Sequence, residues 1–315
     1  MISKTSKVGV IGAGNVGADV ANALVLLRKC VKVVLFDRTL SKAEGQAWDI
    51  EDSIPLLEEM EIIPSTKYED LADSDVIVVT VGVQQKLGQT RLDTLSDNAE
   101  IIRSTMKELD RVAPNSIVLI VSNPVDVLTR IALANSTRAE NLIFGSGTVL
   151  DTARLRYQLG KRLNVALQDV HVYVIGEHGD SEFIVWSSAF IGGIALTEFP
   201  IPEGVTLEQI QQEYAELTRK RGNSILERKG NTSYGISTVV CQLVDSILRD
   251  EKQIFPVSAR ADSNYGVGSE IVLGLPCIIS SIGIERKLVI PRNAHEQRLL
   301  QESASKLNEA YNSGA

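Results

Sequence analysis

The sequence of 315 residues predicts an α/β protein, in which a Rossmann-type, doubly wound parallel sheet is followed by a second, α+β domain. Apolar runs alternate with helical patterns throughout the first half. The runs are continuous and rich in β-branched residues, which is typical of strands buried on both faces. A glycine-rich turn joins the first run to the first helix. Strand–helix–strand order at these lengths favours a parallel sheet.

Five segments of the first half are expected to be strands: residues 8–11, 31–36, 61–66, 75–81 and 116–121. Helices are expected at residues 15–27, 93–109 and 124–133. In the first helix, apolar side chains recur at helical spacing, namely Val16, Val20, Leu24 and Leu27. The helices at 15–27 and 93–109 each lie between two expected strands, as a crossover connection requires.

The second half is less regular. Helices are expected at residues 151–163, 207–226, 236–248 and 294–311, and a strand at 171–175. Residues 270–275, 278–282 and 286–290 resemble an antiparallel meander with glycine and proline turns. Since no low-complexity linker interrupts the chain, we expect a tight boundary between domains 1–146 and 147–315.

Composition excludes several classes of protein. Hydrophobic content is 44%, charged content is 23% and the net charge is −8. An acidic chain is a poor partner for nucleic acid. No apolar run approaches the length of a membrane span or a signal peptide. The three cysteines show no metal-binding spacing, so we expect no metal site, no disulfide framework and a cytoplasmic location.

The glycine-rich turn has the features of a dinucleotide site. Gly12, Gly14 and Gly17 follow a strand and open a helix, and Val16 lies within the same turn. Asp37 ends the second strand, where an acid would bind the ribose hydroxyls and repel a 2′-phosphate. We therefore expect NAD rather than NADP, bound by residues 1–146, with the substrate bound by residues 147–315.

Four polar side chains could form a reacting centre. Asn123 follows a strand, and His178 lies between glycines in Gly-Glu-His-Gly-Asp. Histidine suits proton exchange near neutral pH. Asp151 could orient His178, and Arg154, one helical turn later, could bind a carboxylate. Taken singly, each has a more common structural explanation: a helix-starting turn, a bystander histidine or a surface ion pair.

Residues 82–91 form a polar segment with glycines near both ends, as a closing lid would have. Arg91 could enter the site with the lid and stabilise a developing alkoxide. By itself, the segment is more often a solvated loop with an exposed cation.

Together these segments resemble the lactate and malate dehydrogenase family over nearly the whole chain. The resemblance rests on GAGNVG, SNPVD, LDTAR, GEHGDS and QQKLGQTR. It implies His178 as proton donor and acceptor, Asp151 as its partner and Arg154 as carboxylate anchor. It also implies Arg91 as lid arginine and Asn123 near the substrate, in a hydride transfer between NAD and a 2-hydroxy acid.

Two positions resemble the lactate members of the family. Gln85 stands where malate members carry an arginine for the second carboxylate, and Thr232 stands where they usually have a small residue. We therefore expect reversible reduction of pyruvate to L-lactate, with malate chemistry as the alternative. Ile236 matches the residue that packs on the nicotinamide. Leu87 and Asn231 depart from the family pattern, which leaves the rate and the side-chain preference open but not the type of reaction.

Arg156 and His171 occupy the positions that bind fructose 1,6-bisphosphate in allosteric bacterial members. The resemblance implies a homotetramer, activated if the sugar bisphosphate neutralises these cations. The alternative is that Arg156 is a surface helix residue and His171 a strand-end residue.

Two other classes of protein could also contain a dinucleotide-binding sheet. An NAD-using glycosidase would share the dinucleotide fold but needs a cysteine and histidine arrangement for metal, which the sequence lacks. A non-catalytic NAD-binding protein would have no need of His178, Asp151, Arg154 and Arg91 together. Both classes are therefore disfavoured.

Overall fold

A nine-stranded sheet forms the centre of the molecule in this computed structural model, which describes residues 6–57, 59–83 and 91–314, without the side chains of 91–93. The strand order is β14-β13-β12-β6-β5-β4-β1-β2-β3. The parallel strands are β1 (Lys7–Ile11), β2 (Lys32–Phe36), β3 (Glu61–Ser65), β4 (Val76–Val79), β5 (Ile117–Ile120) and β6 (Ile143–Gly145). The predicted fold class is confirmed.

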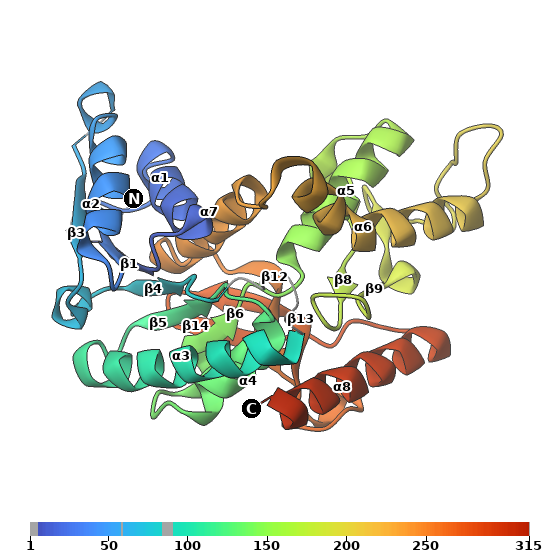
Figure 1. Cartoon of the computed structure of the whole chain (residues 1–315). Helices are drawn as coiled ribbons and strands as arrows, with labels where there is room; N and C mark the ends of the chain where they lie inside the picture. The colour runs from blue at the N-terminus through green and yellow to red at the C-terminus, as the bar shows by residue number, and fades with distance from the viewer. Residues whose placement is uncertain (1–5, 58, 84–90, 315) are drawn as a thin grey trace.

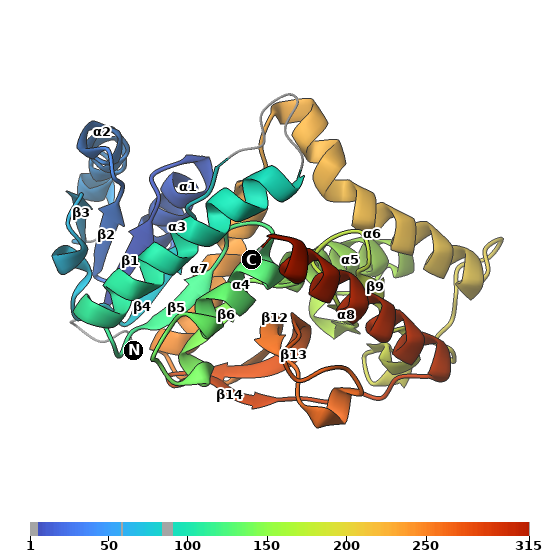
Figure 2. The ribbon, with the colours of Figure 1, turned by 60° about the horizontal axis from the view of Figure 1, so that its bottom comes forward.

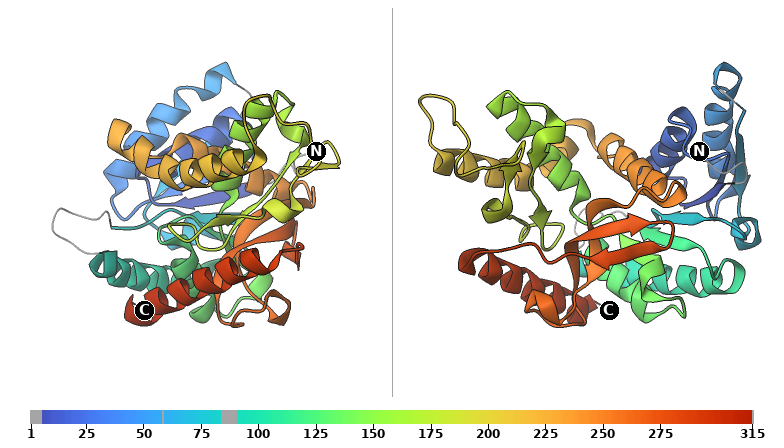
Figure 3. Two further views of the ribbon diagram at one scale, coloured as in Figure 1. Left: turned by 90° about the vertical axis from the view of Figure 1, so that its right-hand side faces the viewer. Right: turned by 180° about the vertical axis from the view of Figure 1, so that it is seen from behind.

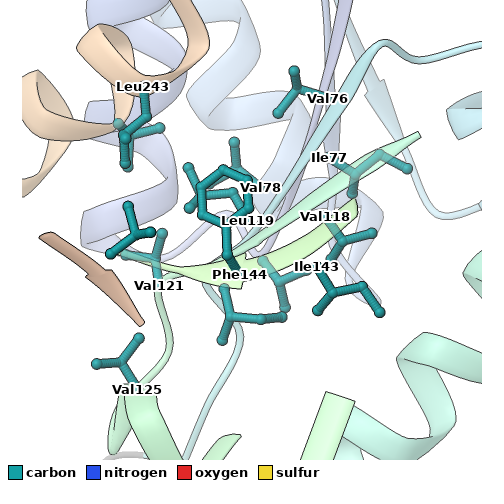
Figure 4. Close-up of a cluster of buried hydrophobic side chains, with 14 of the residues drawn as sticks. Val76, Ile77, Val78, Val118, Leu119, Val121, Val125, Ile143, Phe144 and Leu243 are labelled. Carbon is teal, nitrogen blue, oxygen red and sulfur yellow. The ribbon is translucent and has the colours of Figure 1, made fainter. Parts of the chain in front are cut away.

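The parallel strands lie at the centre of the core because both of their faces are covered. Every residue of β4 and β5 is buried. Figure 4 shows Phe144 of β6 packed among side chains of β4 and β5, with Leu243 of α7 above them. β-branched side chains suit this environment, since they pack well on a pleated surface.

Helices cover both faces of the sheet. One face carries α1 (Asn15–Leu26) and α7 (Tyr234–Leu248), which contact each other, and the other carries α3 (Arg91–Val112), α4 (Val125–Ala134) and α8 (Ala294–Gly314) (Figure 1). α2 (Leu40–Glu51) lies beside β3 at one end of the molecule. At the other end, α5 (Val149–Leu163) packs on the long α6 (Leu207–Lys229), as Figure 2 shows.

The strand order fixes the place of the site. The order β3-β2-β1-β4-β5-β6 reverses direction between β1 and β4. In such sheets, ligands bind outside the carboxyl ends of the strands at this reversal. The loops after β1, β2, β4 and β5 all open there.

The antiparallel strands of the second half extend this same sheet, as the view from behind in Figure 3 shows. The meander prediction was wrong in detail. β12 (Gln253–Arg260) was not expected, and the two strands predicted at 270–275 and 278–282 are replaced by the single strand β13 (Val272–Ser280), which pairs with β14 (Gly283–Lys287). Pro276, which has no N–H to donate, lies within β13 opposite Pro256 of β12, and its carbonyl accepts the Leu288 N–H at 2.8 Å.

The predicted strand at 171–175 is also corrected, since it divides between two small sheets. β7 (Val170–His171) pairs with β10 (Phe190–Ile191), which pairs with β11 (Ile194–Ala195). β8 (Val174–Ile175) pairs with β9 (Phe183–Ile184). A second core of α5, α6 and these strands lies beneath them. This arrangement turns the chain directly after β8 towards the sheet.

Several elements were not predicted from the sequence, namely α2, β6 and the strands β9 to β12. α2 buries only Ala43, Ala47 and Ile50, which is a weak apolar pattern, and β6 is three residues long. The other predicted helices are confirmed within four residues at each end. Within the described ranges, no helix is long and apolar enough to cross a membrane.

Candidate active site

The turn between β1 and α1 requires glycine at two positions. Gly12 has a φ of +106°, a left-handed conformation that favours glycine. A Cβ at Gly17 would lie 1.7 Å from the carbonyl oxygen of Gly12. Gly14 caps α1 and brings no side chain over the first turn. The N-terminus of α1 is therefore accessible to a phosphate group, which helix N–H groups and the helix dipole favour.

Asp37 lies against this turn, directly after β2. Its Oδ2 accepts the Ala13 N–H at 2.9 Å, and its Oδ1 accepts the Thr39 N–H at 3.0 Å. Burial acts to raise the pKa of Asp37, but these two hydrogen bonds and the nearby Lys42 outweigh it and lower the pKa. The carboxylate is thus charged and held beside the turn, as the sequence predicts for an NAD site.

One cavity of about 520 Å³ joins this turn to the predicted reacting centre. Among its lining residues are the predicted Gly14, Val16, Asn123, Arg154, His178, Thr232 and Ile236. They come from α1, α5, α6–α7 and the loops after β5 and β8. The cavity can therefore hold an extended cofactor next to a small substrate.

His178 and Asp151 form a hydrogen-bonded pair in this cavity. Nδ1 of His178 lies 2.7 Å from Oδ2 of Asp151, and Asp151 is buried. Burial acts to lower the pKa of His178, but the charge of Asp151 and its hydrogen bond outweigh burial and raise the pKa to about 9. Burial acts in the opposite sense on Asp151, where the charges of His178 and Arg154 lower the pKa. The imidazole is therefore protonated at neutral pH, with Nε2 free of this pairing.

Arg154 contacts the same carboxylate from the next turn of α5. Its guanidinium donates to Oδ1 of Asp151 at 2.8 Å, while 16% of its side chain stays exposed in the cavity. From the sequence, Arg154 could be either a member of an ordinary ion pair or an anchor for a carboxylate. In this geometry Arg154 is paired with Asp151 and still presents a charged surface to the cavity.

Two functional residues were missed by the sequence reasoning. Asp126 of α4 is buried; its Oδ2 accepts the His178 N–H at 2.7 Å, and its Oδ1 accepts from Ser258 at 2.6 Å. It therefore fixes the loop that carries His178. Burial raises the pKa of Asp126 to about 6, against these hydrogen bonds. Asp126 stands in the Ser-Asn-Pro-Val-Asp segment, so its place after a strand was the available signal.

Asn98 of α3 is the second missed residue. Its side chain accepts the Val83 N–H at 2.7 Å and donates to the Asn123 carbonyl at 3.2 Å. It thus ties the segment after β4 to the loop after β5. A buried asparagine within a helical pattern gives no sequence signal of this role. The amide oxygen of Asn123 itself accepts the Val125 N–H at 3.3 Å, so the expected helix-starting turn is also present.

The remaining predicted residues lie elsewhere. Gln85 lies outside the described residues, and Arg91 begins α3 with its side chain outside them. Arg156 of α5 donates to the Val172 carbonyl at 3.2 Å, next in sequence to the exposed His171. This pair lies close together but does not line the cavity.

Comparison with known proteins agrees with this arrangement. Residues 6–145 match the family description "lactate/malate dehydrogenase, NAD binding domain", and residues 148–315 match "lactate/malate dehydrogenase, alpha/beta C-terminal domain". An L-lactate dehydrogenase of Clostridium botulinum (strain Loch Maree / Type A3) is 38% identical over 318 aligned positions, covering 100% of this chain and 99% of that protein. One of Moorella thermoacetica is 38% identical, covering 96% of each.

Solved structures give the same result. The minor L-lactate dehydrogenase of Enterococcus mundtii, in a ligand-bound form, superposes with a TM-score of 0.94 at 33% identity, over 99% of both chains. A lactate dehydrogenase from a Medee basin deep-sea metagenome library gives a TM-score of 0.93 at 33% identity, again over 99% of both. With sequence, fold and family descriptions in agreement over its full length, the chain belongs to the lactate/malate dehydrogenase family.

Proposed function

We propose that this protein is an NAD-dependent L-lactate dehydrogenase, which reversibly reduces pyruvate to L-lactate. The observation that carries the proposal is the single cavity that joins the glycine turn of α1 to His178 and Arg154. The relatives described above, which match over the full length, are named L-lactate dehydrogenases. The buried pairing of His178 with Asp151 supports an acid–base role, since such pairing holds a proton on the ring.

In the proposed reaction, each side chain has a separate task. Arg154 binds the pyruvate carboxylate, for which its planar guanidinium is suited. NADH supplies the hydride. His178 donates a proton from Nε2 to the carbonyl oxygen, while Asp151 holds Nδ1 and stabilises the imidazolium. Asn123 lies at the cavity wall near both, and Ile236 offers an apolar surface to the nicotinamide ring.

The residues of the cofactor site fit NAD. Gly14 brings no side chain over the first turn of α1, so the backbone there can approach a pyrophosphate closely, and Gly17 lets α1 pack tightly against the turn at Gly12. The charged Asp37 would accept hydrogen bonds from the ribose and repel a 2′-phosphate. Gly14 and Val16 line the same cavity as His178.

The choice of pyruvate over oxaloacetate rests on Gln85 and Thr232. A neutral amide at Gln85 leaves the second carboxylate of oxaloacetate unpaired, which costs several kcal/mol in a closed site.

NADH oxidation should be measured with pyruvate, oxaloacetate and branched 2-oxo acids. Pyruvate should give the highest kcat/KM, and Gln85→Arg should shift the ratio towards oxaloacetate. A higher kcat/KM for oxaloacetate in the wild type would identify a malate dehydrogenase instead. Arg91 is assigned to the lid on its sequence position alone.

Arg156 and His171 support a regulatory proposal. Arg156 donates to the carbonyl of Val172, the residue that follows His171 in the chain, and His171 is exposed. We place a fructose 1,6-bisphosphate site there, at an interface of a homotetramer, where the ligand would offset the repulsion of cations. Pyruvate saturation curves with and without the sugar bisphosphate test this, and identical curves at sub-saturating pyruvate would exclude it. Analytical ultracentrifugation tests the tetramer.

We propose that the chain divides into an NAD-binding domain (1–146) and a substrate domain (147–315). The boundary falls between β6 and α5. A cytoplasmic location is supported by Cys30, Cys241 and Cys277, which are free, buried thiols.

A further inference from the structure

Glu182 is a second buried carboxyl group next to His178 and Asp151. It directly precedes β9 and is only 6% exposed. One carboxylate oxygen of Glu182, one of Asp151 and a ring nitrogen of His178 all lie within 4.8 Å of one another. Among the residues that the structure describes, Oε1 of Glu182 has no hydrogen-bond partner. A buried carboxyl oxygen without a hydrogen-bond partner costs free energy of folding, and such atoms are rare in native proteins.

The charged groups that face Glu182 come from three elements. Asp151 and Arg154 lie on α5, Arg219 on α6, and His178 on the loop after β8. Burial, followed by the charge of Asp151, raises the pKa of Glu182 to about 8, against the three cations. Glu182 therefore gains a negative charge as the pH rises through this value.

The groups that face His178 are Asp151, Glu182 and Asp126. Asp151 makes the hydrogen bond and has the largest effect in raising the pKa, and Glu182 follows it as the next charge. Asp126 accepts the backbone N–H of the same residue. The imidazole thus has two carboxyl groups close to its ring, of which only Asp151 has an assigned task.

We propose that Glu182 is a positioning residue that helps to hold the proton on His178, by supplying a second carboxylate charge near the imidazole. The proposal rests on the proposed function, in which His178 carries the transferred proton. Glu182 acts through the ring and does not touch the substrate. When Glu182 ionises above neutral pH, His178 stays protonated, and can act as an acid, up to a higher pH. The neutral ring, which accepts the proton of lactate, is then formed only at a higher pH.

The variant Glu182→Gln keeps the shape and removes the charge. Loss of a neighbouring opposite charge should lower the pKa of His178 by about one unit. Lactate oxidation, which requires neutral His178, should then be about fivefold faster at pH 8, because one unit is a tenfold change in the protonation ratio. Pyruvate reduction, which requires the imidazolium, should fall at a lower pH than in the wild type. A merely structural defect would instead lower both rates at every pH.

A direct titration provides a second readout. The chain has three histidines, so NMR of ¹³Cε1-labelled protein resolves few ring signals, and His178 is identified by its loss in His178→Gln. The matched control is Glu302→Gln, an exposed carboxyl on α8 that lines a cavity with Glu182. The control should keep the His178 midpoint, and Glu182→Gln should lower it.

An unchanged His178 midpoint in Glu182→Gln, or an equal loss of both rates at every pH, would overturn the proposal. The two proposals fail separately. If wild-type protein does not reduce pyruvate, the proposed function is wrong. The NMR midpoint in the unliganded protein still decides whether Glu182 controls the proton on His178.

Discussion

Nδ1 of His178 lies 2.7 Å from Oδ2 of Asp151, although the two residues stand on different elements of the fold. The other oxygen of Asp151 accepts from Arg154 at 2.8 Å. A single buried carboxylate therefore orients the proposed proton donor and the proposed substrate anchor together.

Asp151→Asn should impair proton transfer. The amide keeps the size of the side chain but removes the charge that stabilises the imidazolium of His178. We expect kcat/KM for pyruvate to fall about 10²–10⁴-fold, the usual contribution of general acid–base catalysis. NADH affinity, measured by fluorescence titration, should stay at the wild-type value because His178 lines the cavity and Asp151 does not. A wild-type kcat/KM would contradict the assigned role.

The pH dependence should follow the raised pKa of His178, about 9. Pyruvate reduction requires the protonated ring, so its kcat/KM should be constant near pH 7 and fall about tenfold per pH unit above pH 9. Lactate oxidation requires the neutral ring, so its kcat/KM should rise up to the same pH and then level. Stopped-flow or steady-state profiles in both directions test this. A midpoint at the ordinary imidazole value would show that the Asp151 charge does not reach the ring.

Arg154→Lys should separate charge from geometry. Lysine keeps the positive charge but cannot form two parallel hydrogen bonds with a carboxylate. We expect a higher KM for pyruvate and a loss of about 100-fold in kcat/KM through misplacement of the substrate. The matched control is Arg162→Lys, at an exposed position of the same helix, which should behave as the wild type. Equal kinetics of the two variants would remove Arg154 from the substrate site.

Asp37→Ser should relax the discrimination between NAD and NADP. The charged carboxylate beside the glycine turn would repel a 2′-phosphate, and such like-charge contacts cost several kcal/mol. We expect the ratio of kcat/KM for NADPH over NADH to rise about 100-fold, aided by Lys42, which lies 3.3 Å from Asp37. Asp49→Ser, at an exposed position of α2, is the control. The idea fails if the ratio does not change.

Gly17→Ala should disrupt the cofactor turn. The added Cβ would lie 1.7 Å from the Gly12 carbonyl oxygen, a backbone atom that cannot move without shifting α1 from β1. We expect a loss of about 1–3 kcal/mol in the free energy of unfolding and a loss of NADH binding. Thermal denaturation and NADH fluorescence measure the two effects.

The control for that change is Gly45→Ala in α2, where an added Cβ meets nothing within 4 Å. It should stabilise the protein by up to about 1 kcal/mol, since alanine is the better helix former. Wild-type NADH affinity in Gly17→Ala would mean that tight packing of α1 on β1 at this position is not required for cofactor binding.

Local sequence patterns were sufficient to predict the parallel half of the fold and the chemistry of the site. Buried parallel strands need continuous β-branched runs, and a close helix–strand turn needs Gly12 and Gly17, so both are visible in local patterns. Asp37, His178, Asp151 and Arg154 were identified because each follows a strand or shares a helix turn with another.

The residues that support the site from distant parts of the chain became visible once the chain was folded. Asp126 is 52 positions from His178, and Asn98 is 25 from Asn123, so no local spacing reports their hydrogen bonds. The strand β12 and the continuous strand β13 form because backbone N–H and C=O groups pair between β12, β13 and β14, and this pairing is not visible in local sequence patterns. The surroundings of Glu182 and His178 also set their charge states. Burial and the charge of Asp151 raise the pKa of Glu182, whereas for His178 the charge and hydrogen bond of Asp151 raise the pKa against burial.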